Sequence, residues 1–260
     1  MRIETGETVK ATLLANAGVL LEYRGTRLLI DGIFDKKGHC FSNLSAEQWE
    51  GLKAGTGIFS GIDYLLFTHE HGDHFSPERT MEYLGCQKPK ALFLPKEGSA
   101  ALRALHKQAE SLKIPCVLLE EQLCRNTVFK PEEGTRIRAF QTRHLDKSFW
   151  DVPHFCYLLE FGGKKLFFTA DVDFTYETFS ALQGVPLDAV FINPLMRHSK
   201  EGRRVFSEGM LRTRLSVVYH IPFAGEDAMQ VRGIAERERL SGENDEAVIF
   251  LMERGQTCFL

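Results

Sequence analysis

Short apolar runs separated by polar turns recur along the whole chain, and this pattern predicts many short strands with helices between some of them. Apolar positions at helical spacing, as at Leu102 and Leu105, mark the helical segments. The expected strands cover residues 9–14, 19–23, 27–30, 62–67, 91–94, 116–119, 128–130, 136–142, 155–161, 165–169, 189–192, 216–219 and 247–251. The expected helices cover residues 45–53, 77–84, 99–113, 174–182, 207–215 and 226–240.

The order of these elements indicates the architecture. Each half of the chain begins with strands joined by tight turns and continues with alternating strands and helices. The sequence has no repeat at a fixed short period, no low-complexity tract and no linker between the halves. We therefore expect a single domain over residues 1–260, of α/β class, in which two mixed sheets form a sandwich with helices outside.

Composition narrows the classes of protein. With 260 residues, 43% of them hydrophobic, the chain can bury a large core. The formal net charge of −3 gives no support for binding to nucleic acid or to an anionic membrane. Residues 1–10 are polar, no apolar run reaches the roughly 20 residues of a membrane span, and the six cysteines form no C-x-x-C pair. These features favour a soluble cytoplasmic protein with reduced thiols.

The densest group of reactive side chains is the run His69-Glu70-His71-Gly72-Asp73-His74. It follows the buried strand expected at residues 62–67, and the helix expected at residues 77–84 begins just after it. Ser76 and Pro77 are typical of the N-cap and the first position of such a helix. The four ligand-type side chains therefore lie on a turn at the carboxyl end of a strand, where open α/β folds place their chemistry.

Three later ligand candidates also follow predicted strands. They are His144 after residues 136–142, Asp171 after residues 165–169 and His220 after residues 216–219. If these strand ends meet at one edge of the sandwich, seven ligands converge, which is too many for one metal and suits two with a carboxylate between them. Five imidazoles and two carboxylates favour zinc, or iron and manganese, over an all-oxygen calcium site.

The run from His69 to His74 matches the H-x-H-x-D-H signature, and the chain resembles the metallo-β-lactamase superfamily from about residue 13 to residue 222. Asp31 at the end of an early strand and the later His144, Asp171 and His220 match in order and setting. The resemblance implies a four-layer αββα sandwich. The opening residues 14–22 and 28–32 are similar to the ascorbate-phosphate lactonase-like branch.

The resemblance also implies a role for each ligand. His69, His71 and His144 would bind the first metal, Asp73, His74 and His220 the second, and Asp171 would bridge the two. Asp73 would in addition orient the attacking hydroxide, and Asp31 would accept a hydrogen bond from a ligand histidine. The chain departs from the family at Ala170, where a glycine usually precedes the bridging aspartate.

Some assignments stay open in the sequence. His154 is a rival to His144, and it could instead contact the substrate, act as an acid or be a core histidine. Asp173 is a rival to Asp171, although it is placed to cap the helix expected at residues 174–182. Arg197 and His198 begin a basic run that continues to Arg204, and such a run is usually a solvated loop but could bind a phosphate or carboxylate of the substrate.

The function expected from these residues is that of a dinuclear metallohydrolase. Two divalent ions, zinc in the first place and manganese or iron otherwise, would activate a bridging water against a small ester, lactone or phosphoester. A nuclease-like phosphodiesterase is the first alternative, but the negative net charge of the chain is evidence against it. The second alternative is a non-hydrolytic di-iron protein that binds metal for redox purposes. We expect a small-molecule substrate and no membrane or nucleic-acid partner.

Overall fold

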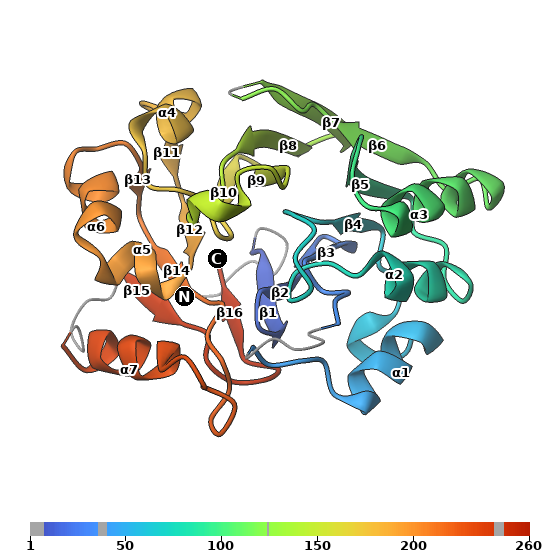
Figure 1. Ribbon diagram of the computed structural model, residues 1–260, viewed down its shortest axis with the longest axis horizontal. Coiled ribbons are helices and arrows are strands. Elements are labelled where there is room, and N and C mark those ends of the chain that lie inside the picture. Colours follow the sequence, from blue (N-terminus) through green and yellow to red (C-terminus); the bar gives the residue numbers. More distant parts are fainter. Residues whose placement is uncertain (1–7, 36–40, 124, 242–246) are drawn as a thin grey trace.

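Two seven-stranded sheets face each other, and helices cover their outer surfaces (Figure 1). The computed structural model describes residues 8–35, 41–123, 125–241 and 247–260. The first sheet has the order β16 (Thr257–Phe259), β1 (Lys10–Ala15), β2 (Gly18–Tyr23), β3 (Thr26–Ile30), β4 (Tyr64–Leu66), β5 (Ala91–Pro95) and β6 (Cys116–Leu119). The second has the order β15 (Val248–Phe250), β14 (Ser216–Val218), β12 (Ala189–Ile192), β10 (Lys164–Phe168), β9 (His154–Phe161), β8 (Thr135–Thr142) and β7 (Asn126–Glu132).

The expected sandwich of two mixed sheets is confirmed. Strands β1 to β3 pair antiparallel and β3 to β6 parallel in the first sheet. In the second sheet β7 to β10 pair antiparallel, whereas β10, β12, β14 and β15 run parallel. Each half of the chain thus builds most of one sheet, except that β16 returns from the C-terminal end to pair with β1.

One continuous apolar core joins the sheets. The ring of Phe93 on β5 meets the ring of Tyr157 on β9 edge to face, with centroids 6.3 Å apart. Tyr23 on β2 also packs across the sandwich on Phe161 of β9, with the rings tilted by 41° and their centroids 5.3 Å apart. Such cross-sheet pairs bury large aromatic surfaces from both halves together. The single domain over residues 1–260 stays a prediction, and this shared core supports it.

The helices lie where caps and apolar stripes place them. On the first sheet are α1 (Ala46–Ala54), α2 (Pro77–Leu84) and α3 (Ala100–Ser111), and on the second α4 (Tyr176–Phe179), α5 (Pro194–His198), α6 (Lys200–Ser207) and α7 (Val231–Ser241) (Figure 1). The side chains of Ser45, Ser76 and Ser99 each accept a hydrogen bond from the backbone N–H three residues on, which caps α1, α2 and α3.

The helix expected at residues 207–215 is wrong. The helices of this region are α5 and α6, and the chain then turns at Gly209 (φ +69°) into the two-residue strand β13 (Arg212–Thr213), which pairs with β11 (Pro186–Leu187). The side chain of Asn193 caps α5, with Pro194 at its first position, and Ser199 caps α6. These local caps place most of the basic run in two helices, where a loop was expected.

One helix begins later than expected. The helix expected from residue 226 begins at Val231, because Asp227 accepts hydrogen bonds from the backbone N–H groups of Val231 and Arg232. The thiols of Cys86, Cys116, Cys156 and Cys258 are free, while Cys40 and Cys124 lie outside the described residues. Across the described part of the chain, every helix is too short or too polar to cross a lipid bilayer.

Candidate metal centre

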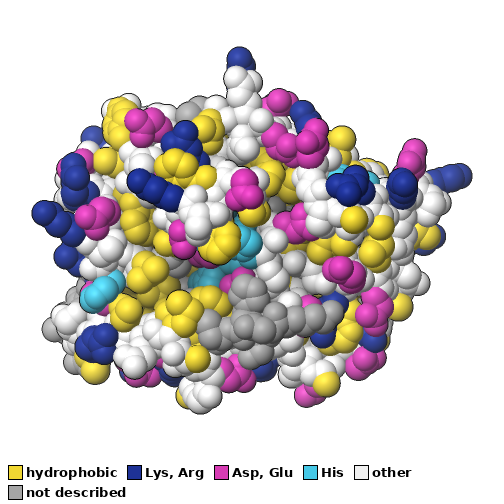
Figure 2. Space-filling view, in the orientation of Figure 1, with side chains coloured by type: hydrophobic (Ala, Val, Ile, Leu, Met, Phe, Trp, Pro, Cys, Tyr) yellow, Lys and Arg dark blue, Asp and Glu magenta, His cyan; other side chains and the backbone are white. Residues whose placement is uncertain are grey.

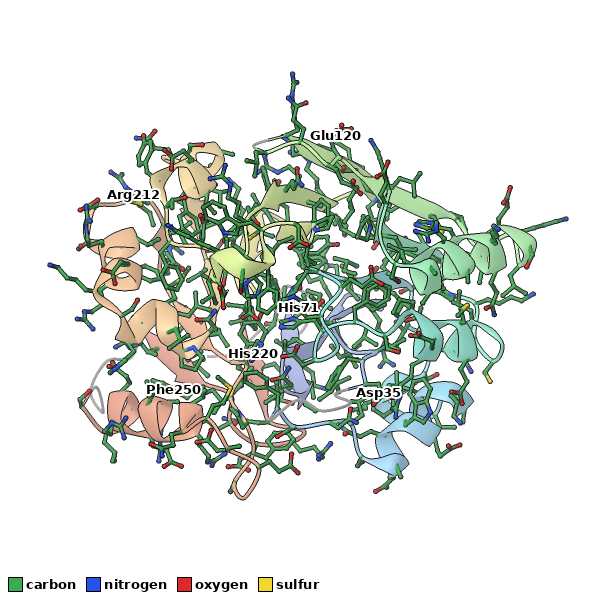
Figure 3. The ribbon with its side chains drawn as sticks, viewed as in Figure 1. Asp35, His71, Glu120, Arg212, His220 and Phe250 are labelled. Carbon is green, nitrogen blue, oxygen red and sulfur yellow. The ribbon has the colours of Figure 1, made fainter. Side chains whose placement is uncertain are left out.

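The strands that precede the candidate ligands end at one edge of the sandwich. Asp31 follows β3, and the run from His69 to His74 follows the parallel neighbour β4. In the second sheet β10 and β14 are parallel to β12, and β8 has the same direction because β9 is antiparallel to both β8 and β10. His144, Asp171 and His220 therefore emerge at the same edge. Figure 3 places His71 and His220 near the middle of the molecule, one from each half.

Hydrogen bonds between loops hold these strand ends together. Leu145 N–H donates to the backbone oxygen of Asp171 (2.7 Å), and His144 forms an isolated bridge with Val172. Across the sandwich, Phe155 N–H donates to the backbone oxygen of Thr68 (2.8 Å), directly before the first ligand. The ligand-bearing turns are thus fixed by backbone bonds rather than by side chains alone.

The ligand atoms fall into overlapping groups whose members lie within 4.8 Å of one another. The first ligand group is His69, His71 and His144; the second ligand group is Asp73, His74 and His220; and Asp171 joins His69 and His74 in a third set. Two atoms bound to one ion at about 2 Å each can be at most about 4 Å apart. In the second ligand group, His220 Nε2 is 2.8 Å from His74 Nε2, and Asp73 Oδ2 is 3.7 Å from the first of these nitrogens and 3.8 Å from the second. These three atoms therefore fit one ion.

Asp171 lies between the two groups. Its Oδ2 is 3.2 Å from His74 Nε2, 3.5 Å from His220 Nε2 and 3.7 Å from His144 Nε2. The same oxygen thus faces ligand nitrogens of both groups, which is the position of a bridging carboxylate. In the first ligand group, His69 Nε2 and His71 Nδ1 are 3.0 Å apart.

Asp31 orients two of the ligand histidines through hydrogen bonds. Its Oδ2 is 2.8 Å from His74 Nδ1, and its two oxygens accept hydrogen bonds from the N–H and the hydroxyl of Thr68. Because Thr68 gives its hydroxyl proton to Asp31, Thr68 Oγ1 accepts from His69 Nδ1 at 3.0 Å. Both His69 and His74 then carry their protons on Nδ1 and turn Nε2 toward the ligand groups, the orientation that metal binding requires.

Two asparagines, which the sequence analysis did not identify, orient the carboxylate ligands. Asn193 Nδ2 donates to the backbone oxygen of Ala170 (3.1 Å) and to Asp171 Oδ1 (3.3 Å), which leaves Oδ2 toward the histidines. Asn16 Nδ2 donates to the backbone oxygen of Asp73 (2.8 Å) and lies 3.4 Å from its Oδ2. Asn193 follows a buried strand as the ligands do, so the same strand-end rule could have found it.

Backbone strain is concentrated beside the second ligand group. Asp31, Ala170 and His220 adopt positive φ values of 46°, 46° and 59° although none is glycine. This conformation costs an L-residue roughly 1–2 kcal/mol and persists where the surroundings impose it, often at functional sites. The value at Ala170 also gives a physical reason for the glycine that the superfamily usually has there.

The ionisation states of the side chains at the centre favour the binding of metal cations. Burial lowers the pKa of His69 well below its usual value and that of His71 to about 4, so both rings are neutral with a free lone pair. Burial also disfavours charge on His74, but the Asp73 and Asp171 carboxylates outweigh this and raise its pKa well above the usual value. Burial opposes ionisation of Asp171, yet His220 and His74 hold its pKa well below the usual range.

The remaining sequence candidates lie apart from the ligand atoms. His154 is fully buried, with Nδ1 2.7 Å from Thr142 Oγ1 and its ring 4.9 Å from that of His69, so it packs behind the centre and does not face the solvent side. Asp173 accepts from the hydroxyls of Thr175 and Thr178. Arg197 and His198 lie 3.7 and 3.1 Å from the carboxylate of Glu238 on α7, away from the ligands.

The residues present fit a pair of divalent ions. Imidazole and carboxylate donors suit zinc, iron or manganese, and the second ligand group and Asp171 already have distances compatible with shared ions. One contact of the first ligand group is at odds with this. Asp146 N–H donates to His144 Nδ1 (3.0 Å), but a neutral ring bound to metal through Nε2 carries its proton on Nδ1, so that hydrogen bond must give way.

Comparisons with known proteins identify the family of the chain and its fold. The family model described as "Beta-lactamase superfamily domain" matches residues 26–239, most of the chain. No curated protein sequence matches this chain. Igni18, a metallo hydrolase from Ignicoccus hospitalis, is 14% identical with a TM-score of 0.61, and the match covers 97% of this chain and 98% of that one. An isothiocyanate hydrolase from Delia radicum gut bacteria is also 14% identical, with a TM-score of 0.65 and coverage of 96% and 98%.

A third solved structure shares the fold with a different chemistry. CmlA, a diiron β-hydroxylase from Streptomyces venezuelae, is 16% identical with a TM-score of 0.60, and the match covers all of this chain but 55% of CmlA. At such identities the structures demonstrate a common fold, and the family match identifies the chain. It belongs to the metallo-β-lactamase superfamily.

Proposed function

We propose that the chain is a dinuclear metal-dependent hydrolase that acts on a small ester, lactone or phosphoester. The observation that carries this proposal is the position of Asp171 Oδ2, between ligand nitrogens of both groups. His69, His71 and His144 would hold one ion and Asp73, His74 and His220 the other. When bound, two such ions supply a hydroxide at neutral pH and stabilise developing negative charge on the substrate.

The protein side chains then have distinct tasks. Asp171 fixes the two ligand groups relative to each other, because its Oδ2 faces nitrogens of both groups while Asn193 donates a hydrogen bond to its Oδ1. Asp73 has an oxygen beside the ligand nitrogens and lines the cavity that opens to solvent, so it can orient the attacking water and pass a proton to the leaving group. Asp31 holds His74 and, through Thr68, His69.

The identity of the metal belongs to this proposal. Zinc is our first choice, since the donor set is typical of it and hydrolysis needs no redox change. Iron is the alternative, and the fold likeness to the diiron β-hydroxylase CmlA is the observation behind it. Membership of the ascorbate-phosphate lactonase-like branch stays a prediction. The phosphodiesterase alternative gains no support from the cavity above the ligands, whose described lining contains no lysine or arginine.

The test combines metal analysis with a hydrolysis screen. The full chain is purified, stripped with a chelator and reloaded with zinc, manganese or ferrous iron, and the bound metal is counted by mass spectrometry. We expect about two ions per chain and turnover of at least one of lactones, carboxylic esters, phosphomonoesters or phosphodiesters. His71→Ala removes a ligand, while His198→Ala removes an exposed histidine outside the centre and serves as the matched control.

Three outcomes would count against the proposal. A single ion per chain after reloading contradicts the dinuclear centre. Two redox-active iron ions without hydrolysis of any ester class favour the oxidative alternative. Equal turnover by wild-type protein and metal-free His71→Ala would show that hydrolysis does not use these ligands.

A further inference from the structure

The cavity above the ligands is walled mainly by apolar side chains. It has a volume of about 580 Å³, within the range of sites for small organic molecules. Its floor carries the ligands His71, Asp73, His144, Asp171 and His220, and its walls include Phe41, Leu145, Phe149, Leu195, Met229 and Val231. Figure 2 shows histidines at the bottom of a hollow near the middle of the face, with hydrophobic side chains beside it.

Basic side chains are missing from this cavity in the described part of the chain: no lysine or arginine lines it. Its one charged group apart from the ligands is Asp146, which is acidic and already accepts hydrogen bonds from Ser148. The nearby basic run does not compensate, because Arg197 and His198 face Glu238 and line no part of it. Apart from the ligands, a phosphate or carboxylate on the substrate would thus meet apolar walls, Asn193 and the acidic Asp146, but no lysine or arginine.

Two wall residues expose much apolar surface at the mouth. Phe149 is 41% exposed and Met229 is 60% exposed, and they come from segments far apart in the sequence, after β8 and before α7. Exposed apolar surface that gathers around a polar centre is typical of ligand sites, since a ligand that covers it gains hydrophobic free energy. The walls therefore favour an apolar group adjoining the reacting bond.

We propose that this site takes an uncharged carboxylic ester or lactone whose acyl part is apolar and fills the cavity, with the scissile carbonyl at the ligand floor. This inference rests on the proposed hydrolase function and specifies its substrate class. In the reaction, water adds across the acyl–oxygen bond: the hydroxide joins the carbonyl carbon, the bond to the leaving oxygen breaks, and that oxygen takes the remaining proton. The products are an alcohol and a carboxylic acid, which releases its proton to water at neutral pH.

The first experiment uses the metal-loaded full chain with p-nitrophenyl esters of two, four, six and eight acyl carbons. Each CH₂ that becomes buried should raise kcat/KM up to about fourfold, until the cavity is full. The matched anionic substrates, p-nitrophenyl phosphate and bis(p-nitrophenyl) phosphate, should be turned over more slowly than the hexanoate. A flat dependence on chain length, or a preference for either phosphate, overturns the inference while leaving a hydrolase in place.

Wall variants connect the effect to this cavity. Met229→Ser and Leu195→Ser should reduce the gain per CH₂, because both side chains line the apolar walls of the cavity. Phe259→Ser is the control: Phe259 is 68% exposed on β16 and lies outside the cavity. If the wall variants retain the full dependence on chain length, the apolar walls do not contact the substrate and the inference fails.

A binding measurement separates this inference from the hydrolase proposal. Calorimetry with acetohydroxamate, hexanohydroxamate and octanohydroxamate, which are uncharged at neutral pH, reports chain-length dependence without turnover. Affinity should rise with chain length in wild-type protein and less steeply in Met229→Ser. If no ester is hydrolysed but this series keeps its slope, the hydrolase proposal fails and the apolar site stands. Equal affinities, or no measurable binding of octanohydroxamate, overturn the site.

Discussion

The two ligand groups of the candidate centre are built differently. In the second ligand group all three side chains are nearly fully buried, and their mutual distances already suit one ion. In the first ligand group His71 is partly exposed to the cavity, and His144 receives a backbone hydrogen bond on Nδ1 that conflicts with metal at Nε2. One half of the centre is thus preorganised, and the other must rearrange.

The supporting contacts show the same asymmetry. Asp31 holds His74 directly, Asn16 holds Asp73, and the strained φ values lie at Asp31, Ala170 and His220. The first ligand group has one such contact, from Thr68 to His69, while aromatic Phe149 packs on His71 with centroids 4.5 Å apart. Preorganised ligands bind metal more tightly because less ordering is needed on binding. We therefore expect the second ligand group to fill first.

Removal of the bridging carboxylate should have the largest effect, because it damages both groups. In Asp171→Ala we expect fewer than one ion per chain by mass spectrometry and hydrolysis at the level of chelated protein. The matched control is Asp173→Ala, two residues on, whose carboxylate only accepts from Thr175 and Thr178. That variant should keep two ions although its thermal stability falls. If Asp173→Ala loses the metals and Asp171→Ala keeps them, the bridge is assigned to the wrong aspartate.

Substitution within each group should separate them. His71→Ala should retain one ion, held by the second ligand group with nearly unchanged affinity. His74→Ala should lose the tighter ion and, in the metal-free state, also lower the free energy of unfolding by about 3–5 kcal/mol, because buried Asp31 loses a partner. Metal titration by calorimetry and urea unfolding measure the two effects. Equal affinity losses in both variants would contradict the asymmetry.

Supporting residues give a smaller and more selective effect. Loss of a hydrogen-bond partner behind a ligand typically weakens metal binding about 10–100-fold. Asp31→Asn should weaken binding to the second ligand group by this factor, because the amide no longer attracts the proton on His74 Nδ1. Thr68→Val should weaken the first ligand group through His69 and, because its hydroxyl also donates to Asp31, the second ligand group to a smaller extent. Titration of the two sites in both variants measures the selectivity, and identical profiles would remove the distinction.

Much of this arrangement could be predicted from the sequence because ligands that follow strands obey one rule. The elements before Asp31, His69, His144, Asp171 and His220 were all expected as strands, and parallel strands bring their ends to one edge. The family match confirms the superfamily that the signature indicated. The sites of the individual residues stay predictions until metal binding is measured.

The parts that escaped prediction depend on contacts distant in sequence. The role of Asn16 is one of these, since nothing local shows that its amide reaches Asp73, 57 residues away. The depth of His154 depends on its register with Thr142 across β8 and β9, which a single strand does not reveal. By contrast, the helices α5 and α6 had local signals at Asn193, Pro194 and Ser199, and the charge run concealed them.

The smallest expected effect concerns the strain beside the second ligand group. Ala170→Gly relieves the cost of a positive φ, but it also frees the unfolded chain and removes a buried methyl group, and these contributions nearly cancel. We expect the free energy of unfolding to change by less than about 1 kcal/mol, with two ions retained. Ala170→Val keeps the strain and adds a β-branched side chain, so it should destabilise by more than about 2 kcal/mol. If Ala170→Gly loses an ion from the second ligand group, the alanine is needed to hold Asp171 rigid, and the strain is part of how the preorganised half binds metal.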